Sequence, residues 1–572
     1  MKRLVWAVAS ASLLVACGGG GGAVDCPEPE VLSGTLSGEV VVGADCKNWS
    51  VPSTVTVPDG AKLVIQPGTA LTFGAGASLV VRAGKLEALG TEDAPILFTG
   101  AEKTPGSWGG VVLQDASSTE NTLSHVTIEY GGSAPSGSGM KAALRLSGTA
   151  ATPSRLALTA STLRHGSGHG LAIDAFSRLP VFTGNALTSN ADGAAAAHPM
   201  SVGQLVADNV YTGNARDRVV VPAGEIRSGE ATFHAIGVPF HVGALDVLAD
   251  GRLVIAPSVT VAFEPGARLR LADGGRLVAE GTATAPIVIT GVESTPGSWQ
   301  GIFVQDAGST ENVIAHATVE FAGIQDGWAA AAANIALTHA GARMRIHDAV
   351  IRSSAGYGIY VDARATLEFS HNALTANALG AAYAFAGVAH VFDAGSSYAG
   401  NTDGNDFVRI ARSPLEADVT WQALDVPFRL DDVNVRSHLT IQPGAVVELD
   451  AGKFLRFEST ARLSAVGTST ARIQFRGAAG AEWNGLQFQS TLQDNRLEYA
   501  SVTNVGSGAW SWSQAPHGAV RLYQSRLSVA NSRFVNNQGY GIWQSPSITT
   551  VSNCGSAIFE GNSAGVSNRT CL

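Results

Sequence analysis

Thr104-Pro105-Gly106-Ser107-Trp108-Gly109-Gly110-Val111-Val112-Leu113-Gln114-Asp115 is the stretch around which this chain is organised. The pattern returns at residues 295–306 as TPGSWQGIFVQD and, more weakly, at residues 480–489 as GAEWNGLQFQ. Each copy places one tryptophan after a turn of small residues and before an apolar run that is typical of a strand. The tryptophans of successive copies are 191 and 184 residues apart. This regular return predicts a repeat architecture of three modules.

The composition of the 572-residue chain suits short strands joined by tight turns. Charged residues make up only 15%, glycine occurs 67 times, and Lys, Glu and Met are scarce. The chain is too long for one ordinary compact core, but the core of a repeat protein grows along an axis. Without the leader assigned below, 35 basic residues stand against 47 acidic ones, a net charge of about −12. This acidic balance argues against nucleic acid as a partner.

The first residues have the pattern of an export signal. Lys2 and Arg3 provide positive charge, and residues 4–16 form an apolar segment that is too short to span a bilayer as a stable helix. The sequence Leu14-Val15-Ala16-Cys17 then resembles the lipobox of bacterial lipoproteins. An ordinary secretory signal that happens to contain a cysteine is the alternative.

The resemblance to a lipobox implies that Cys17 is lipidated and becomes the first residue of the mature protein. Five glycines at residues 18–22 then serve as a flexible tether. Acyl chains bury about 0.8 kcal/mol per methylene, so several chains anchor a protein firmly in a membrane. Gly18 stands after the cysteine in place of Asp, and by the same resemblance this implies the outer membrane.

Four further cysteines, Cys26, Cys46, Cys554 and Cys571, predict disulfides in an exported chain. Four cysteines allow three pairings. The two ends of a rod of stacked coils would lie on the order of 100 Å apart, whereas a disulfide needs Cα atoms within about 7 Å. The pairings that remain are Cys26–Cys46 and Cys554–Cys571, one at each end. Free thiols or a metal site are the alternative, although no CxxC spacing supports them.

Short apolar runs follow one another from Val51 onward and are separated by Gly, Pro and Asn. Runs such as Leu63–Ile65 and Ile96–Thr99 have the length and residue types of strands, and no segment has a sustained helical period. A propeller would repeat every 40 to 50 residues or so, whereas the subrepeat here is about 20 to 25 residues. A solenoid fits better, with apolar positions stacked inward and asparagines bonding the backbone at turns.

The order of these signals resembles the right-handed parallel β-helix repeats of bacterial surface proteins, which have the pectin-lyase-like fold. It is carried by Pro67-Gly68, by Gly90-Thr91 before Pro95-Ile96, and by the Trp108 stretch. The resemblance implies an all-β solenoid of about twenty coils. We expect this domain organisation: a lipoprotein signal peptide at 1–16; the lipidated cysteine, tether and N-terminal cap at 17–50; and modules at 51–230, 231–416 and 417–572, the last with a C-terminal cap.

Several ionisable residues recur between the modules, but none forms a catalytic pattern. The first two modules share acids or histidines that the third replaces, which is typical of turn and rim positions inherited by duplication. We assign no catalytic residue, and we expect no cofactor and no metal because the 13 histidines lack ligand spacing. The recurring sets are Asp115, Asp306 and Ser490; Glu129, Glu320 and Thr503; His125, His316 and Tyr499; and Asp174, Asp362 and Ser545.

Three tryptophans lie in loops that differ between the modules. Trp510 and Trp512 occur in a Gly/Ser-rich stretch, and Trp328 occupies the corresponding loop of the second module. Loops on a rigid scaffold often carry function, and an exposed indole can stack on a sugar ring. These residues are candidate ligand-binding residues, and the alternative is that the indoles fold back to cover the rod. Trp108, Trp299 and Trp483 are expected to be packing anchors instead.

The sequence therefore favours a membrane-anchored, non-catalytic binding or structural protein of the cell envelope. Its expected partners are the membrane, through the lipid anchor, and a polysaccharide or a surface protein. The alternative is a polysaccharide lyase or glycoside hydrolase, which would need a groove with two acids or an acid and an arginine within about 10 Å. A third interpretation is an adhesin or a passenger domain.

Overall fold

The computed structural model describes residues 26, 28–133, 140–325, 327, 329, 331–489, 491–506, 517–546 and 548–571. These residues form short strands that pair in parallel, together with a few short 3-10 helices. Among the residues described, no helix has the length and apolar character needed to cross a membrane. Contacts divide the chain into two compact units: residues up to Asp246 with Gly251–Phe263, and Val247–Asp250 with the residues from Glu264 onward.

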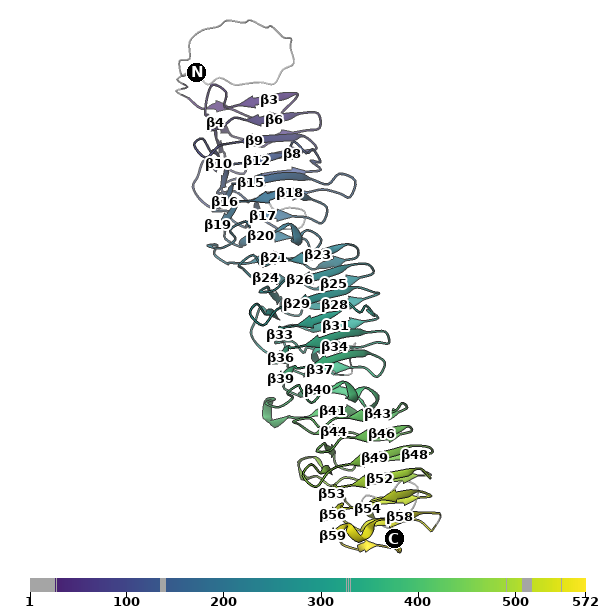
Figure 1. Ribbon diagram of the computed structural model, residues 1–572. Coiled ribbons are helices and arrows are strands. Elements are labelled where there is room, and N and C mark those ends of the chain that lie inside the picture. The colour runs from purple at the N-terminus through teal and green to yellow at the C-terminus, as the bar shows by residue number, and fades with distance from the viewer. Residues whose placement is uncertain are drawn as a thin grey trace. The chain divides into compact units, whose positions relative to one another are not determined.

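In the first unit each coil of the chain contributes one strand to each of three parallel sheets (Figure 1). One sheet contains every third strand from β1 (Glu30–Val31) to β19 (Ala186–Thr188). The second contains every third strand from β2 (Gly34–Thr35) to β20 (Gly193–Ala197). The third runs in the same way from β3 (Glu39–Val42) to β18 (Arg178–Thr183). Successive coils therefore stack strand on strand.

The second unit follows the same rule. Its longest sheet takes every third strand from β28 (Arg268–Ala272) to β40 (Gly380–Phe385) and then from β41 (Val408–Ala411) to β59 (Ile558–Glu560). The other sheets run from β29 (Arg276–Glu280) to β38 (Thr366–Ser370), from β30 (Ile287–Gly291) to β39 (Ala373–Thr375), from β42 (Ser413–Leu415) to β60 (Gly565–Ser567), and from β43 (Val419–Trp421) to β58 (Thr550–Ser552).

The apolar residues of each strand alternate and stack into the core. In β6 (Lys62–Ile65), Leu63 and Ile65 are buried and their neighbours are partly exposed. The strand pairs in register with β9 (Lys85–Leu89), so that Leu63 lies beside Leu86. Burying one such side chain stabilises the fold by roughly 1.5–3 kcal/mol. The period of two read from the sequence therefore builds a column of apolar side chains inside the coils.

Asparagines stack at the turns, as the sequence predicts. The Asn185 amide nitrogen donates to the Leu158 carbonyl at 2.9 Å and to the Asn209 side-chain oxygen at 2.9 Å, one coil further on. The side-chain oxygen of Asn185 in turn accepts from the Ser161 backbone at 3.0 Å. Asn377 and Asn401 repeat this ladder in the second unit. These amides satisfy backbone groups that the turns leave buried between strands.

Strands that are equivalent in the three modules are twenty strands apart along the chain. The apolar run after each tryptophan forms β11 (Gly110–Gln114), β31 (Gly301–Gln305) and β51 (Leu486–Gln489). The described residues hold 60 strands, which at the observed three strands a coil agrees with the prediction of about twenty coils. The module boundaries at 230/231 and 416/417 stay predictions, because the compact units are divided elsewhere.

Successive modules do not join through equivalent sheets. At the first junction β20, a strand of the second sheet, is followed in its own sheet by β21 (Val219–Val221), which is the equivalent of β1. At the second junction β40 is followed in the same way by β41. Each junction carries a 3-10 helix, η1 (Val202–Gln204) and η2 (Ala386–Val391). Each new module thus begins on a neighbouring face of the preceding one.

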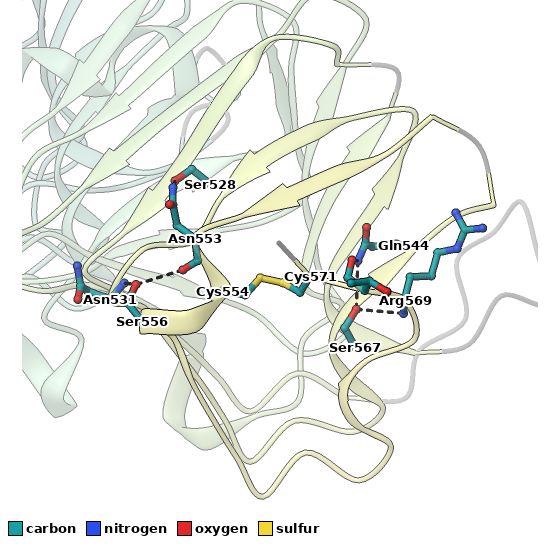
Figure 2. Close-up of a disulfide and its surroundings, with 10 residues drawn as sticks. Ser528, Asn531, Gln544, Asn553, Cys554, Ser556, Ser567, Arg569 and Cys571 are labelled. Atoms are coloured by element: carbon teal, nitrogen blue, oxygen red, sulfur yellow. Dashed lines mark hydrogen bonds between the residues drawn. A yellow bond between two sulfur atoms is a disulfide. The ribbon is translucent and has the colours of Figure 1, made fainter.

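Both predicted disulfides are present. Cys26 bonds Cys46 and Cys554 bonds Cys571, each with Cα atoms 5.8 Å apart. The first joins the start of the described chain to the segment before β4 (Asn48–Val51), and the second links η5 (Cys554–Ser556) to the segment after β60 (Figure 2). The alternative of free thiols or a cysteine metal site is therefore wrong for these four residues. Cys17 and the rest of residues 1–25 lie outside the described residues.

Candidate functional site

The tryptophan of each repeated stretch is a packing anchor, as predicted. Trp108, Trp299 and Trp483 are all completely buried. Each indole nitrogen donates to a backbone carbonyl at 2.8 Å, and the acceptors are those of Glu129, Glu320 and Thr503. The third acceptor confirms that Thr503 is the counterpart of the two glutamates. The buried indoles are therefore not available to stack on a ligand.

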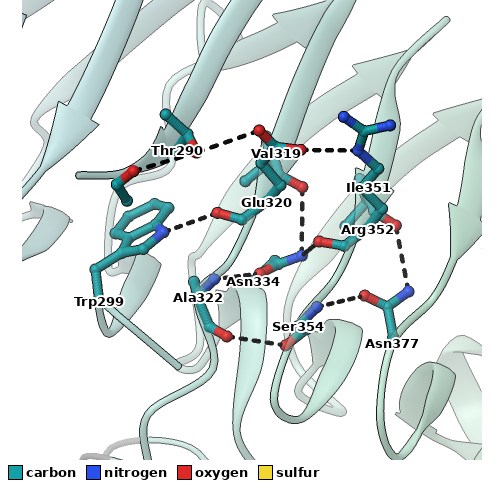
Figure 3. A network of polar contacts seen from close by, with 11 residues as sticks. Thr290, Trp299, Val319, Glu320, Ala322, Asn334, Ile351, Arg352, Ser354 and Asn377 are labelled. Atoms are coloured by element: carbon teal, nitrogen blue, oxygen red, sulfur yellow. Dashed lines mark hydrogen bonds and ion pairs between the residues drawn. The ribbon is translucent and has the colours of Figure 1, made fainter. Parts of the chain in front are cut away.

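The recurring glutamates hold neighbouring coils together. The Glu320 carboxylate accepts from the Thr290 hydroxyl at 3.2 Å and from the Arg352 guanidinium at 2.8 Å (Figure 3). Glu129 does the same with Thr99 and Arg164, both at 2.9 Å. Both glutamates are buried and already engaged on both carboxylate oxygens. Their arrangement serves the fold and leaves no free carboxylate for acid or base catalysis.

The other recurring polar residues lie at corners of the coils. His125, His316 and Tyr499 share a left-handed backbone conformation, with φ of 51°, 44° and 46°. Asp174 accepts hydrogen bonds from three backbone nitrogens, Gly148 at 2.6 Å, Ser177 at 2.8 Å and Phe176 at 3.1 Å. These contacts confirm the prediction of turn and rim positions. Ser490 lies outside the described residues.

Three histidines of the second module meet at one corner, which the sequence did not reveal. His347 bonds Asp348 at 2.8 Å, and the rings of His316 and His347 are 6.2 Å apart. The bond from His347 and the proximity of His316 and His371 lower the pKa of the exposed Asp348. Still, in the part of the chain that the structure covers, no group of three or more His, Cys, Asp or Glu is arranged to hold a metal ion.

The candidate residues Trp328, Trp510 and Trp512 lie outside the described residues, but the strands around them are defined. The Trp328 segment precedes β34 (Ala333–Leu337), and the Trp510 segment follows β53 (Ala500–Thr503). Both strands belong to the long parallel sheet of the second unit.

A cluster of aromatic side chains lies on β37 (Tyr357–Val361) and β40 of this sheet, and we call it the tyrosine face: Tyr360, which is buried, and Tyr357, Tyr383 and Phe385, which are partly buried. The Tyr360 and Tyr383 rings stack with centroids 5.5 Å apart, and Tyr357 meets Tyr383 edge-on at 5.3 Å. Ala329 and Ala331, beside Trp328 in the sequence, pack against the same cluster. Burial raises the pKa of Tyr357 and Tyr383, so both hydroxyls stay protonated at neutral pH. Tyr357, Tyr383 and Phe385 remain partly accessible.

The tyrosine face continues into charged residues on the next coils. Tyr383 is in register with Arg409, and Arg409 with Arg429. Both guanidiniums bond the carboxylate of Asp450, Arg429 at 2.7 Å. Burial works to raise the pKa of Asp450, but the hydrogen bonds from the two arginines outweigh it and hold the pKa below its ordinary value. The tyrosine face is therefore followed on the next coils by two arginines whose positions are fixed by ion pairs with Asp450.

Comparison with known families agrees with this architecture. Residues 34–171 match the family described as a pectate-lyase-like beta helix domain. The fold is a right-handed parallel β-helix. The search of curated proteins found no match to the chain. A shared β-helix identifies the scaffold, and the function has to be argued from the surfaces that this chain places on it.

Proposed function

We propose that the protein is a lipoprotein of the cell envelope whose β-helix binds polysaccharide without cleaving it. The anchor is inferred from the apolar leader and the sequence Leu14-Val15-Ala16-Cys17, with Cys17 as the acylated residue and the outer membrane as the destination. Cells fed a clickable palmitate analogue should label the wild type and not Cys17→Ser. Equal labelling of the two proteins would contradict the anchor and would leave the binding proposal standing.

The tyrosine face is the observation that supports polysaccharide binding. Aromatic rings offer an apolar surface to the C–H groups of a sugar, and a phenol hydroxyl adds a hydrogen bond. Arg409 and Arg429 lie in the same register beyond Tyr383 and can donate further bonds. A surface of rings flanked by donors fits a polysaccharide better than it fits an apolar protein partner.

The match of residues 34–171 to a pectate-lyase-like domain is what favours the alternative, a polysaccharide lyase or glycoside hydrolase. Such enzymes need a converging acid pair, or an acid with a basic residue that is free to act. In that segment Glu129 is bonded to Thr99 and Arg164, and Asp115 accepts from the Thr152 hydroxyl at 2.7 Å. These acids have structural partners, which supports binding over cleavage.

A glycan array combined with a reducing-end assay tests the proposal. The wild type should retain at least one polysaccharide and release no new reducing ends from it. Tyr383→Ala and Tyr357→Ala should each weaken retention by about tenfold or more, the scale of one aromatic contact. Tyr523→Ala, at an exposed tyrosine of another sheet, is the matched control. Release of reducing ends would establish the enzyme, and binding unchanged in both tyrosine-face variants would refute the site.

A further inference from the structure

A cavity of about 690 Å³ opens at the second module junction, away from the tyrosine face. Its floor is the outward side of β43 and β46 (His438–Ile441). Its upper wall comes from His390 of η2 and from Ala394 just beyond that helix. A 3-10 turn stands where the stack otherwise has a strand, so it makes a ledge above the sheet. The volume is within the range of small-molecule sites, roughly 300–1,000 Å³.

The polar groups of this junction cavity are hydroxyls and amides. Thr420 and Thr440 are paired in register on the floor, and Gln422 and Gln442 follow them at the next outward positions. The side-chain oxygen of Gln422 accepts from the Ala394 backbone nitrogen at 3.3 Å, and this bond orients the Gln422 amide group. Each of these side chains can both donate and accept. Such a lining matches a ligand whose surface is itself covered with hydroxyl groups.

The charge of the lining is small and negative. Asp418 is the one carboxylate among the lining residues, which include neither lysine nor arginine. Its carboxylate accepts from the Ser437 hydroxyl and, at 2.9 Å, from the His438 backbone nitrogen. His390 has its Nδ1 at 3.0 Å from the Gly387 carbonyl. The lining also includes His390 and His438, and the carboxylate of Asp418 is the group that disfavours an anionic ligand.

The first junction supplies an internal comparison. There β23 (Glu230–Phe233) and β26 (Arg252–Ile255) are the equivalents of β43 and β46. Glu230 forms an ion pair with Arg252 and accepts from the Thr232 hydroxyl at 2.9 Å. The position of Thr440 is taken by Val254, and that of Gln442 by Ala256. The hydroxyl and amide set is therefore specific to the second junction and is not a requirement of the fold.

The outward side of the same sheet carries polar side chains beyond the cavity. Thr440 is in register with Ser464, then Arg496, Ser528 and Ser552. A second hollow of about 370 Å³ lies over these later strands. Successive strands are about 4.8 Å apart. A linear chain of hydroxyl-bearing units that crosses the strands would meet a polar side chain at each step.

We propose that the junction cavity binds a segment of a neutral polysaccharide, which continues across the outward side of this sheet. The proposal rests on the polysaccharide-binding function above and adds a second site with its own ligand class. Thr420, Thr440, Gln422 and Gln442 hydrogen-bond the sugar hydroxyls, and Asp418 accepts from one of them. At the cavity itself, the carboxylate of Asp418 disfavours a uronic acid unit.

The test uses fluorescently labelled neutral oligosaccharides of glucose, mannose, galactose and xylose, with oligogalacturonate as the anionic counterpart. Thr440→Val keeps the shape of the side chain and removes the hydroxyl, and Gln442→Ala reproduces the residue of the first junction. Each should weaken binding of a neutral oligosaccharide by about tenfold, the effect of one lost hydrogen bond. Thr232→Val is the same change at the first junction and should leave binding unaltered. Thermal unfolding checks that every variant is folded.

The outcomes separate the two proposals. Loss of neutral-sugar binding in Thr440→Val and Gln442→Ala, with Thr232→Val unchanged, supports the junction cavity. Wild-type affinity in both cavity variants, together with loss in Tyr383→Ala, overturns the cavity and leaves the tyrosine face as the binding site. Binding of oligogalacturonate alone also overturns it. A wild type that binds no polysaccharide at all overturns both proposals.

Discussion

The indole nitrogen of Trp483 donates to the backbone carbonyl of Thr503, 2.8 Å away, as Trp108 does to Glu129 and Trp299 to Glu320. The acceptor side chain changes between modules and the bond does not, so the anchor is made to the main chain. Each bond joins the turn that carries the tryptophan to the last residue of a strand in the next coil. The interaction therefore locks two consecutive coils together.

Replacement of Trp483 tests this anchor. Trp483→Phe should lower the free energy of unfolding by about 1–3 kcal/mol, because the buried Thr503 carbonyl loses its donor. Trp483→Ala should lower it by about 3–5 kcal/mol, since a large cavity is added. Chemical unfolding followed by tryptophan fluorescence and circular dichroism measures both values. A phenylalanine variant as stable as the wild type would show that the hydrogen bond contributes nothing.

The asparagine ladder offers a test with a natural control. Asn209 accepts from the Asn185 backbone and side chain and donates to the Phe182 carbonyl at 3.1 Å. Asn209→Leu leaves these buried polar groups without hydrogen-bond partners. Each unpaired group costs about 1–3 kcal/mol, so the variant should be destabilised by several kcal/mol.

Asn209→Ser should be much milder than Asn209→Leu. The equivalent residue in the second module is Ser396, whose hydroxyl accepts from the Asn372 backbone at 2.9 Å. A serine at position 209 can therefore keep an acceptor for the Asn185 backbone nitrogen. The comparison of the two variants by thermal unfolding is decisive, because equal destabilisation would mean that side-chain volume, and not hydrogen bonding, sets the effect.

The disulfide between Cys554 and Cys571 should stabilise only its own neighbourhood. A loop of this size contributes roughly 3 kcal/mol in the chain-entropy model. In the double variant Cys554→Ser/Cys571→Ser, we expect faster amide exchange in β58 and β60, with exchange in the first unit unchanged. Hydrogen exchange with mass spectrometry measures this. Faster exchange throughout the chain would instead show that this end controls the cooperativity of the whole molecule.

Buried His169 makes the stability depend on pH. Burial lowers its pKa to about 4 in the folded protein, the charge of Asp192 opposing this effect. The unfolded chain has the ordinary value of about 6.5, so below that pH the unfolded state binds a proton that the folded state does not. Stability is therefore lost as pH falls from about 6.5 toward 4. The loss between about pH 6.5 and 5 should be roughly 2 kcal/mol.

The control for this prediction comes from the repeat. His169 corresponds to Tyr357 and Tyr540 in the other modules, so His169→Tyr is a substitution that the fold already accommodates. The variant should have a flatter dependence of unfolding temperature on pH between about 5 and 6.5 than the wild type. Parallel curves for the two proteins would assign the dependence to other groups.

Much of the architecture follows from local patterns in the sequence. The alternation of Leu63 and Ile65 with polar neighbours, the asparagines at turns and the return of the tryptophans are all consequences of strand and turn chemistry. The cysteine pairs follow from the length of a stacked solenoid. Alignment of the modules also identifies Thr503 as the counterpart of Glu129 and Glu320, and its backbone carbonyl accepts the same bond from a tryptophan.

Sequence reasoning missed what depends on how one coil lies on the next. His316, His347 and His371 are far apart in the chain and meet only because three corners stack. Tyr360 and Tyr383 stack because their strands pair in register, which leaves Tyr383 partly accessible and Tyr360 buried. Asp418 and Thr440 form no motif at all, since the parallel pairing of β43 with β46 brings them together and η2 adds the wall of the cavity. The cavity therefore could not be read from spacing.

The junctions at η1 and η2 give duplication an unusual outcome. A module that starts on the neighbouring face of its predecessor does not repeat its surface in line with it, so a copied loop or patch points along a new direction from the moment it arises. Each copy is then free to diverge toward a different partner while the buried columns, which all modules share, keep the same residues.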